Sequence, residues 1–240
     1  MNATAAPLVY QNTQFLDVHT ADWDWFEPEH TAERCRSRAY LLLKRVVDLP
    51  LALIALIIAS PLMLVIAIAI RLTSPGAAIF RQTRLGRNGR MFSCFKFRSM
   101  RGDAEDVLRR NPAIWERYVV NGYKLPEDED PRVTRLGRFL RRTSIDELPQ
   151  LINVIRGEMS LVGPRPIVPT ELSEYGDRGD DLVAALPGIT GRWQVSGRSR
   201  IQYPERARVE LEYVYSWSLL EDMRILVLTI PAVLNRTGAY

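Results

Sequence analysis

Histidine and cysteine are scarce in this chain of 240 residues. Its two histidines, His19 and His30, lie within the first 30 residues, and its two cysteines, Cys35 and Cys94, form no CxxC pair. These absences exclude a disulfide framework, a cysteine zinc site, and a histidine triad or multi-histidine metal site in the body of the chain. Neither GxGxxG nor GxxxxGK[ST] occurs, so the nucleotide-binding loops with those spacings are absent too. Chemistry must therefore come from carboxylates, Lys, Arg, hydroxyl groups and the backbone.

Charge of one sign is missing from two segments. Residues 1–33 contain six acidic residues and no Lys or Arg, and the remainder carries a net charge of +10. Residues 71–102 hold eight basic residues and no acidic one. Such a basic surface favours phosphate in a nucleotide, a lipid headgroup or a nucleic acid, although a solvated basic face explains the same charges.

Residues 49–70 lack charge altogether. As a straight helix these 22 residues reach about 33 Å, enough to cross a hydrocarbon core, so we predict membrane insertion. Ser60 and Pro61 lie at the middle, where proline removes one helical hydrogen bond. Basic residues flank the run on both sides, at Lys44, Arg45 and Arg71. Because basic flanks favour the cytoplasmic side, we expect a re-entrant helix broken at Ser60-Pro61, with a proline-kinked span as the alternative.

The rest of the chain predicts an α+β fold. Asn88-Gly89 is a strong β-hairpin signal, so antiparallel strands are expected over 77–86 and 91–100. Helices are expected at 103–110, 114–120, 132–142, 145–156 and 219–234. The arginine-rich helix at 132–142 is amphipathic and predicts an interfacial location, with a surface helix on a soluble core as the alternative.

Two adjacent acids, Asp146 and Glu147, stand at the predicted start of the helix at 145–156. In one interpretation Ser144 and Glu147 form an S-x-x-E capping box. In the other, upstream arginines hold an anionic group against both carboxylates, and a divalent cation such as Mg²⁺ joins them. A carboxylate can also act as a nucleophile toward a phosphoryl group. The spacing leaves both interpretations open.

Several short motifs occur in one collinear order from about residue 40 onward. They include QTRLGRNG at 82–89, KFRSM at 96–100, DPRVT at 130–134, SIDELP at 144–149, VGPRP at 162–166, PGITG at 187–191 and WQVSGR at 193–198. Together with Lys44-Arg45 and Ser60-Pro61, this order resembles the bacterial sugar transferase family, the monotopic polyprenyl-phosphate phosphoglycosyl transferases. Residues 1–40 match nothing in that pattern.

The resemblance implies transfer of a hexose-1-phosphate, from galactose or glucose, out of a UDP-sugar and onto undecaprenyl phosphate. UMP is released, Mg²⁺ is the cofactor, and exopolysaccharide or another glycoconjugate is the product of the pathway. Asp146 is implied as the nucleophile of a phosphosugar-enzyme, and Glu147 as its partner in binding Mg²⁺ or as a base. Residues implied to bind phosphate or nucleotide are Lys96, Arg98, Arg142 and Arg165.

We therefore predict a monotopic α+β membrane protein at the cytoplasmic face of the bacterial inner membrane. It would comprise an acidic tail (1–40), a re-entrant membrane helix-hairpin (41–73) and a small cytosolic catalytic domain with interfacial helices (74–240). Expected partners are the donor, the lipid acceptor, the membrane and downstream glycosyltransferases, but not nucleic acid; homo-oligomerisation is left open. A membrane-anchored basic scaffold is the alternative function, and it does not explain the Asp-Glu pair. A membrane phosphatase explains that pair but not the dipping helix.

Overall fold

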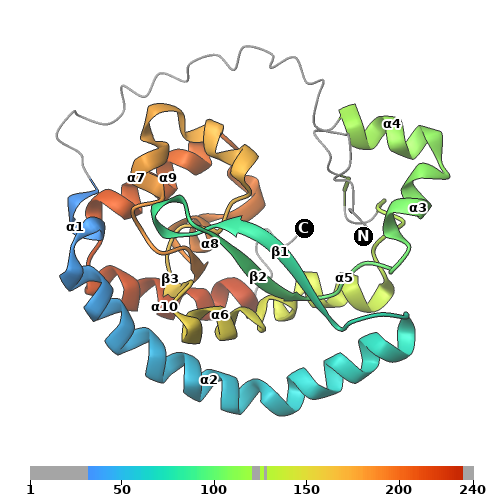
Figure 1. The fold of residues 1–240 in the computed structure, drawn as a ribbon, viewed down its shortest axis with the longest axis horizontal. Helices are drawn as coiled ribbons and strands as arrows, with labels where there is room; N and C mark the ends of the chain where they lie inside the picture. The colour runs from blue at the N-terminus through green and yellow to red at the C-terminus, as the bar shows by residue number, and fades with distance from the viewer. Residues whose placement is uncertain (1–31, 121–124, 127–128, 235–240) are drawn as a thin grey trace, which may run out of the picture.

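The computed structural model describes residues 32–120, 125–126 and 129–234. Its elements, in which η denotes a 3-10 helix, are α1 (Glu33–Arg36), α2 (Arg38–Thr73), β1 (Ile79–Leu85), η2 (Arg87–Gly89), β2 (Met91–Phe97), α3 (Ala104–Arg109), α4 (Pro112–Val120), α5 (Arg135–Arg142), η3 (Ile145–Glu147), α6 (Gln150–Arg156), β3 (Ser160–Val162), η4 (Pro169–Arg178), α7 (Gly179–Leu182), β4 (Gly188–Thr190), α8 (Arg192–Ser196), η5 (Arg198–Arg200), α9 (Glu205–Ser216) and α10 (Leu219–Leu234). Figure 1 shows α2 curving beneath a body in which helices surround two small sheets. This mixture agrees with the predicted α+β class.

The helix α2 is continuous over 36 residues and includes Pro61. The predicted break at Ser60 and Pro61 is therefore wrong as an interruption of the helix. Pro61 has no N–H to donate to the carbonyl of Ile57. The Ser60 hydroxyl donates to that carbonyl instead, at 2.8 Å. This substitute hydrogen bond lets the helix continue through the proline, and Figure 1 shows it curved along its length.

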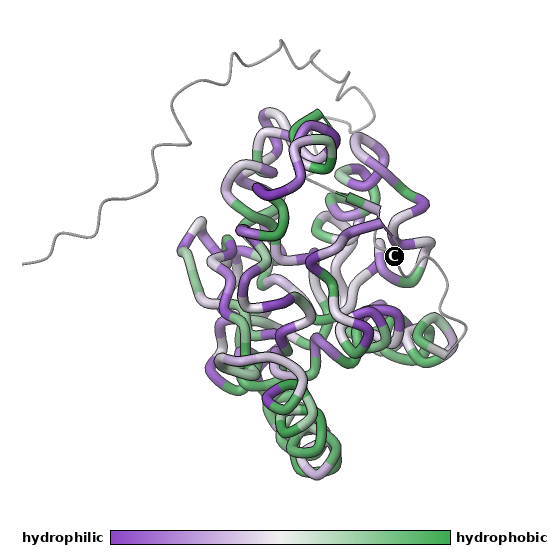
Figure 2. Tube along the Cα trace, turned by 90° about the vertical axis from the view of Figure 1, so that its right-hand side faces the viewer, coloured by the Kyte–Doolittle hydropathy of each residue, from purple (hydrophilic) through white to green (hydrophobic). Residues whose placement is uncertain are grey.

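One face of α2 packs against the body. Buried residues recur at four-residue intervals near its start, at Tyr40, Lys44, Asp48 and Ala52, and again near its end, at Ile66 and Ile70. The outer face is apolar and exposed, with Val46, Leu53, Ile54, Ile57, Ile58, Leu64, Val65, Ile68 and Leu72. In the described part of the chain, α2 is the one helix long and apolar enough to cross a membrane. Figure 2 shows it as a hydrophobic element at the lower edge of the molecule.

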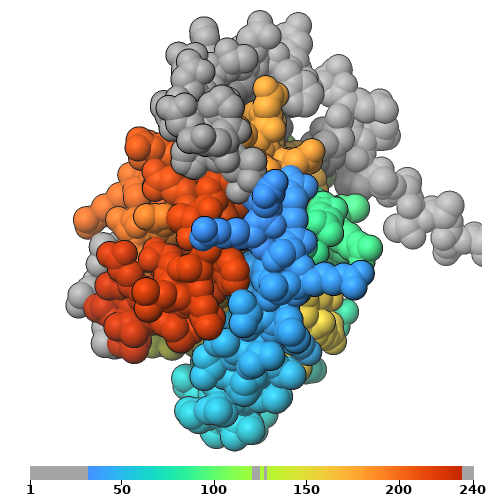
Figure 3. All heavy atoms as spheres, turned by 90° about the vertical axis from the view of Figure 1, so that its left-hand side faces the viewer, coloured from blue at the N-terminus to red at the C-terminus, as the bar shows by residue number. Residues whose placement is uncertain are grey.

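The first described residues belong to the core. Ala32, Cys35 and Tyr40 are fully buried and pack with Val214 and Trp217 of the C-terminal region. α2 begins at Arg38, so residue 40 lies within this helix. Figure 3 shows this blue N-terminal segment against the red C-terminal helices. Of the acidic tail predicted over 1–40, residues 1–31 lie outside the described residues.

The predicted hairpin is confirmed. β1 and β2 pair antiparallel from Ile79 opposite Phe97 to Leu85 opposite Met91. Asn88 and Gly89 in the turn have φ of 55° and 70°, the left-handed conformation that Asn-Gly turns require. β2 runs back from the turn and carries Lys96 near its end; Figure 1 shows this strand beside β1.

A second, parallel pair of strands was not predicted. β3 and β4 align Ser160 with Gly188 and Val162 with Thr190. The backbones beyond β3 approach so closely that a Cβ on Gly188 would lie 2.1 Å from the Gly163 nitrogen. Glycine is therefore required where these two segments meet.

The predicted helix at 145–156 is two elements. η3 contains Asp146 and Glu147, and α6 begins only after Pro149. Proline lacks the N–H needed to continue a regular helix through this point. The two acids therefore lie in a tight turn that projects from the end of α5. The other predicted helices correspond to α3, α4, α5 and α10.

Candidate active site

A cavity of about 1080 Å³ lies among the hairpin, α5, η3 and α8. Asp146 and Glu147 both line it. Further polar residues of its wall are Gln82, Lys96, Arg98, Ser99, Arg101, Arg141, Ser144, Arg165, Thr190, Gln194, Arg198, Ser199 and Thr229. Apolar residues include Ile79, Phe80, Ile145, Leu148, Leu151, Ile189 and Val233. The cavity thus joins a strongly cationic lining to an apolar one.

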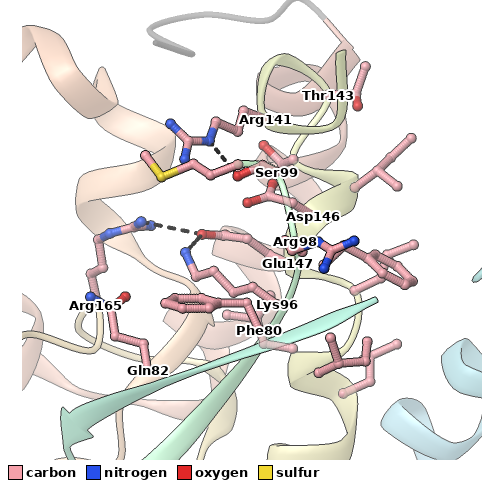
Figure 4. Close-up of a pocket in the computed structure, with 18 of the residues that line it drawn as sticks. Phe80, Gln82, Lys96, Arg98, Ser99, Arg141, Thr143, Asp146, Glu147 and Arg165 are labelled. Carbon is pink, nitrogen blue, oxygen red and sulfur yellow. Dashed lines mark hydrogen bonds and ion pairs between the residues drawn. The ribbon is translucent and has the colours of Figure 1, made fainter. Parts of the chain in front are cut away.

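The capping-box interpretation of Ser144 and Glu147 is wrong. Ser144 has a left-handed φ of 56° and makes no side-chain cap hydrogen bond. Its hydroxyl instead accepts a hydrogen bond from Arg198 Nη1 at 3.1 Å. Glu147 Oε1 lies 2.7 Å from Lys96 Nζ and 3.3 Å from Arg165 Nη2. Figure 4 shows Glu147 between these two cations. The acids therefore face the cavity rather than the helix terminus.

The two neighbouring carboxyl groups are shifted in opposite directions. Burial, and then the adjacent charge of Glu147, raise the pKa of Asp146 to about 6. Burial also acts to raise the pKa of Glu147, but the charges of Lys96 and Arg165 outweigh it and lower that pKa to about 2. Glu147 is therefore ionised at neutral pH, whereas Asp146 titrates close to it. Neighbouring carboxyl groups whose pKa values are shifted in opposite directions are typical of sites in which the two groups have different chemical roles.

The other predicted phosphate ligands differ in their positions. Lys96 and Arg165 meet at Glu147, as described. Arg98 lines the cavity, but its guanidinium donates to the carbonyls of Pro75 and Ser74, both at 2.7 Å. It thereby ties the end of α2 to β2. Arg142 is exposed and lies outside the cavity lining.

Arg141, rather than Arg142, is the α5 arginine in the cavity lining. Its Nε donates to the Ser99 hydroxyl at 2.8 Å, beside Asp146 in Figure 4. α5 approaches closely there because Gly137 has no side chain: a Cβ would lie 1.9 Å from the Ser99 carbonyl oxygen. Gly137 and Arg141 are four residues apart and share a helix face. The spacing of Gly137 and Arg141 was the sequence signal available for this contact. It does not identify Ser99 as the partner of Arg141.

Arg198 and Gln194, from the WQVSGR motif, also line the cavity. From the sequence, contact with donor or lipid and simple packing were equally open for both residues. Both follow β4, in a segment that reaches the site only because β4 pairs with β3. No local pattern in the sequence predicts that β3 and β4 pair in parallel.

The carboxylates fit Mg²⁺ better than a metal held by protein alone. Within the described ranges no group of three or more His, Cys, Asp or Glu side chains comes together. Mg²⁺ commonly takes one or two carboxylates and completes its octahedron with water and substrate phosphates. Asp146 and Glu147 supply that number of carboxylates on a cationic wall suited to phosphate.

Comparison with known proteins gives a match over most of the chain. The model of the bacterial sugar transferase family covers residues 39–236. An undecaprenyl-phosphate galactose phosphotransferase of Salmonella typhimurium is 46% identical over 206 residues, covering 85% of this chain and 43% of that protein. The exopolysaccharide production protein ExoY of Sinorhizobium fredii is 43% identical over 201 residues, covering 82% of this chain and 88% of that protein.

A third relative is the UDP-glucose:undecaprenyl-phosphate glucose-1-phosphate transferase of Caulobacter vibrioides. It is 41% identical over 209 residues, covering 83% of this chain and 72% of that protein. The chain spans less than half the length of the Salmonella relative and most of the length of the other two. By both the family match and these identities, the chain belongs to the bacterial sugar transferase family.

Proposed function

We propose that the chain transfers a hexose-1-phosphate from a UDP-sugar to undecaprenyl phosphate and releases UMP. The observation that carries this proposal is the Asp146–Glu147 pair, with opposite pKa shifts, in a cavity lined by Lys96, Arg141 and Arg165. A nucleotide diphosphate brings negative charge that such cations stabilise. The names of the Salmonella and Caulobacter relatives support galactose or glucose as the hexose and undecaprenyl phosphate as the acceptor.

Asp146 is the proposed nucleophile. One of its carboxylate oxygens bonds to the β-phosphorus of the donor, and the bond from that phosphorus to the bridging oxygen breaks. UMP leaves with the bonding electron pair, and the sugar phosphate stays on Asp146. A phosphate oxygen of the acceptor then attacks the same phosphorus and frees the aspartate as a carboxylate. Because Asp146 is only 8% exposed, its carboxylate is poorly hydrated and reacts without first losing a water shell.

Lys96 and Arg165 hold Glu147 ionised beside the nucleophile, and Arg141 faces Asp146 from the end of α5. These cations place positive charge around the phosphoryl group, where negative charge develops during transfer. Mg²⁺ would be held by Asp146 and Glu147, and when bound it supplies further positive charge to the phosphates.

The packing of α2 supports a monotopic arrangement at the cytoplasmic face. Residues from Tyr40 to Ile70 contact the same body, so a span would draw charged parts of that body into the hydrocarbon core. Insertion of the exposed outer face alone avoids this. The cavity then lies at the membrane surface, where a soluble donor and a lipid acceptor can both reach Asp146.

The full chain in lipid nanodiscs tests the proposal. With Mg²⁺, undecaprenyl phosphate and either UDP-galactose or UDP-glucose, we expect UMP release and sugar label in undecaprenyl pyrophosphate. Without acceptor, about one equivalent of UMP should appear, and label should remain on the denatured protein. Asp146→Asn should abolish both, chelation of Mg²⁺ should stop transfer, and Asp177→Asn, at an exposed acid outside the cavity, should leave transfer unchanged.

Full transfer by the Asp146→Asn protein would contradict the proposed mechanism. Release of inorganic phosphate without acceptor labelling would favour a phosphatase. Membrane binding without any UMP release, at every donor in the panel, would favour the scaffold alternative.

A further inference from the structure

Gln194, in the middle of α8, has a side chain that the fold leaves unsatisfied. The residue is 7% exposed and lines the cavity. In the described part of the chain, neither its Nε2 nor its Oε1 has a hydrogen-bond partner. A buried amide without partners is destabilising, and such groups are rare in folded proteins. Because Gln194 lines the cavity, a ligand that enters the cavity can supply the missing partner.

Other polar side chains of the same wall are partnered within the protein. Gln82, which carries the same carboxamide, accepts a hydrogen bond from Arg84 at 2.7 Å. The hydroxyls of Thr190 and Thr229 lie 2.8 Å apart and satisfy one another. Arg98 and Arg198 of the same wall each leave Nε without a partner, but their other guanidinium nitrogens donate hydrogen bonds, whereas both amide atoms of Gln194 are unpaired.

Gln194 is also close in sequence and space to the proposed phosphate-binding residues. The preceding residue, Trp193, donates from its indole to the Ile201 carbonyl at 3.0 Å, which fixes α8 against η5. The guanidinium of Arg165 lies 5.8 Å from the centre of the Trp193 ring. Arg165 in turn contacts Glu147. α8 thus belongs to the wall that faces the reacting carboxylates.

We propose that Gln194 binds the UDP-sugar donor through its carboxamide, a role that rests on the proposed function. A carboxamide donates and accepts at neighbouring atoms, so it suits a ligand group that does the same. A UDP-sugar offers such pairs in the hydroxyls of the hexose and in the uridine. Donor binding would then satisfy an amide that the unliganded fold leaves unpaired.

The test replaces Gln194 with Met, which is similar in size and has no amide. Because an unsatisfied amide is removed, the thermal midpoint of the free full-length protein should stay the same or rise. Donor affinity should fall roughly 10- to 100-fold. Affinity is measured by calorimetry in the Asp146→Asn background, with UDP-galactose, UDP-glucose and UMP as probes. Gln202→Met makes the same chemical change at an exposed position outside the cavity; it removes a hydrogen bond to the Ser199 carbonyl and should leave donor affinity unchanged.

Each outcome has one interpretation. A loss of affinity shared by UMP assigns the partner to the uridine, and a loss confined to the UDP-sugars assigns it to the hexose; both support the proposal. Unchanged affinity for all three probes overturns it. If the Met protein has a lower midpoint, Gln194→Leu, which also removes the amide and adds no charge, supplies the same comparison. Wild-type transfer is measured separately, so a chain that binds donor without releasing UMP contradicts the proposed function and not the assignment of Gln194.

Discussion

Asp146 and Glu147 share one turn, but their surroundings differ. Glu147 Oε1 contacts Lys96 and Arg165 directly, whereas Asp146 is buried and feels its neighbour's negative charge. The first arrangement stabilises the charged form and the second opposes it. A stable carboxylate suits metal or cation binding, and a destabilised one suits attack on phosphorus.

The activity of the free enzyme should therefore depend on pH through Asp146. Asp146, the proposed nucleophile, must be ionised to react. Its pKa is raised to about 6, so kcat/KM should be full above this pH and fall as pH drops through it. Lys96 lowers the pKa of Asp146, so Lys96→Met should move the midpoint of this decline to higher pH. Initial rates of UMP release between about pH 5 and 8 measure both. A decline centred near the ordinary aspartate pKa, unmoved in the Lys96 variant, would contradict this prediction.

Arg141 and Arg142 provide a matched pair of adjacent arginines. Arg141→Met removes a cation from the cavity wall and should lower kcat about 10²- to 10³-fold. Arg142→Met alters an exposed residue outside the lining and should change kcat less than about threefold. Steady-state kinetics of the two variants measure both changes in kcat. Equal losses, or a larger loss for Arg142, would show that α5 presents a different face to the substrate.

At this scale the sequence predicted the acids and two of their cations, because they lie in distinctive short motifs. The family resemblance implied Arg142 rather than Arg141, and helical periodicity did not correct this, because it identifies helix faces but not what each face contacts. The choice depends on the approach of Gly137 to Ser99, a contact between segments 38 residues apart. The same limit explains Gln194 and Arg198, which reach the cavity through the pairing of β3 with β4.

Among the elements, α2 combines two patterns on one helix. Its inner residues are buried against the body, and its outer face is exposed and as apolar as a membrane span. The length and lack of charge of residues 49–70 were enough to predict insertion. Its continuity through Pro61 was not predicted, because it depends on a rotamer of Ser60 that donates to Ile57.

Both ends of α2 should be accessible from one side of the membrane. Ala39→Cys and Thr73→Cys introduce thiols at exposed positions near the two ends, while the native cysteines are buried. A membrane-impermeant maleimide should label both variants in inside-out vesicles and neither in sealed right-side-out cells. Labelling of the two positions from opposite sides would establish a span and contradict the monotopic arrangement.

Elements with a local sequence signal were predicted well, whereas pairings between segments distant in the sequence were missed. Asn88-Gly89 defines the hairpin by itself, since the turn alone fixes how the strands meet. The helix expected at 145–156 was too long because the apolar periodicity continues across Pro149, where the backbone does not. The pair formed by β3 and β4 joins Ser160 to Gly188 in strands of three residues, too short to give a periodic signal.

At the scale of the whole molecule, a buried ion pair connects the N-terminal helix to the C-terminal one. Lys44 Nζ lies 2.8 Å from Asp222 Oδ2, with the two side chains 2% and 4% exposed. Lys44 also donates to the Val162 carbonyl at 2.6 Å, and Tyr213 and Trp217 donate to Asp222. The long helix α2, the small parallel sheet and the C-terminal helices are thus joined at one point.

Lys44→Met should destabilise the protein by about 3–5 kcal/mol, because it leaves Asp222 buried without its cation. For a chain of this size the thermal midpoint should fall by about 10 °C. Adding Asp222→Leu should recover part of the loss, since no charge then remains unpaired. Arg36→Met is the control: its ion pair with Asp181 is exposed at the arginine, and its loss should change stability by less than about 1 kcal/mol. Similar midpoints for the Lys44 and Arg36 variants would disprove this role.

The curvature of α2 has a consequence for the lipid around it. In the proposed monotopic arrangement, the outer face of α2 would insert from one surface and add area to a single leaflet. Its insertion should become easier where headgroups are spread apart, on convex or loosely packed membranes. Transfer rates should then increase in small vesicles compared with large ones of equal composition, and should stay nearly constant as acyl chain length changes bilayer thickness. The shape of one helix would in this way direct the enzyme toward regions of the membrane with loosely packed lipid.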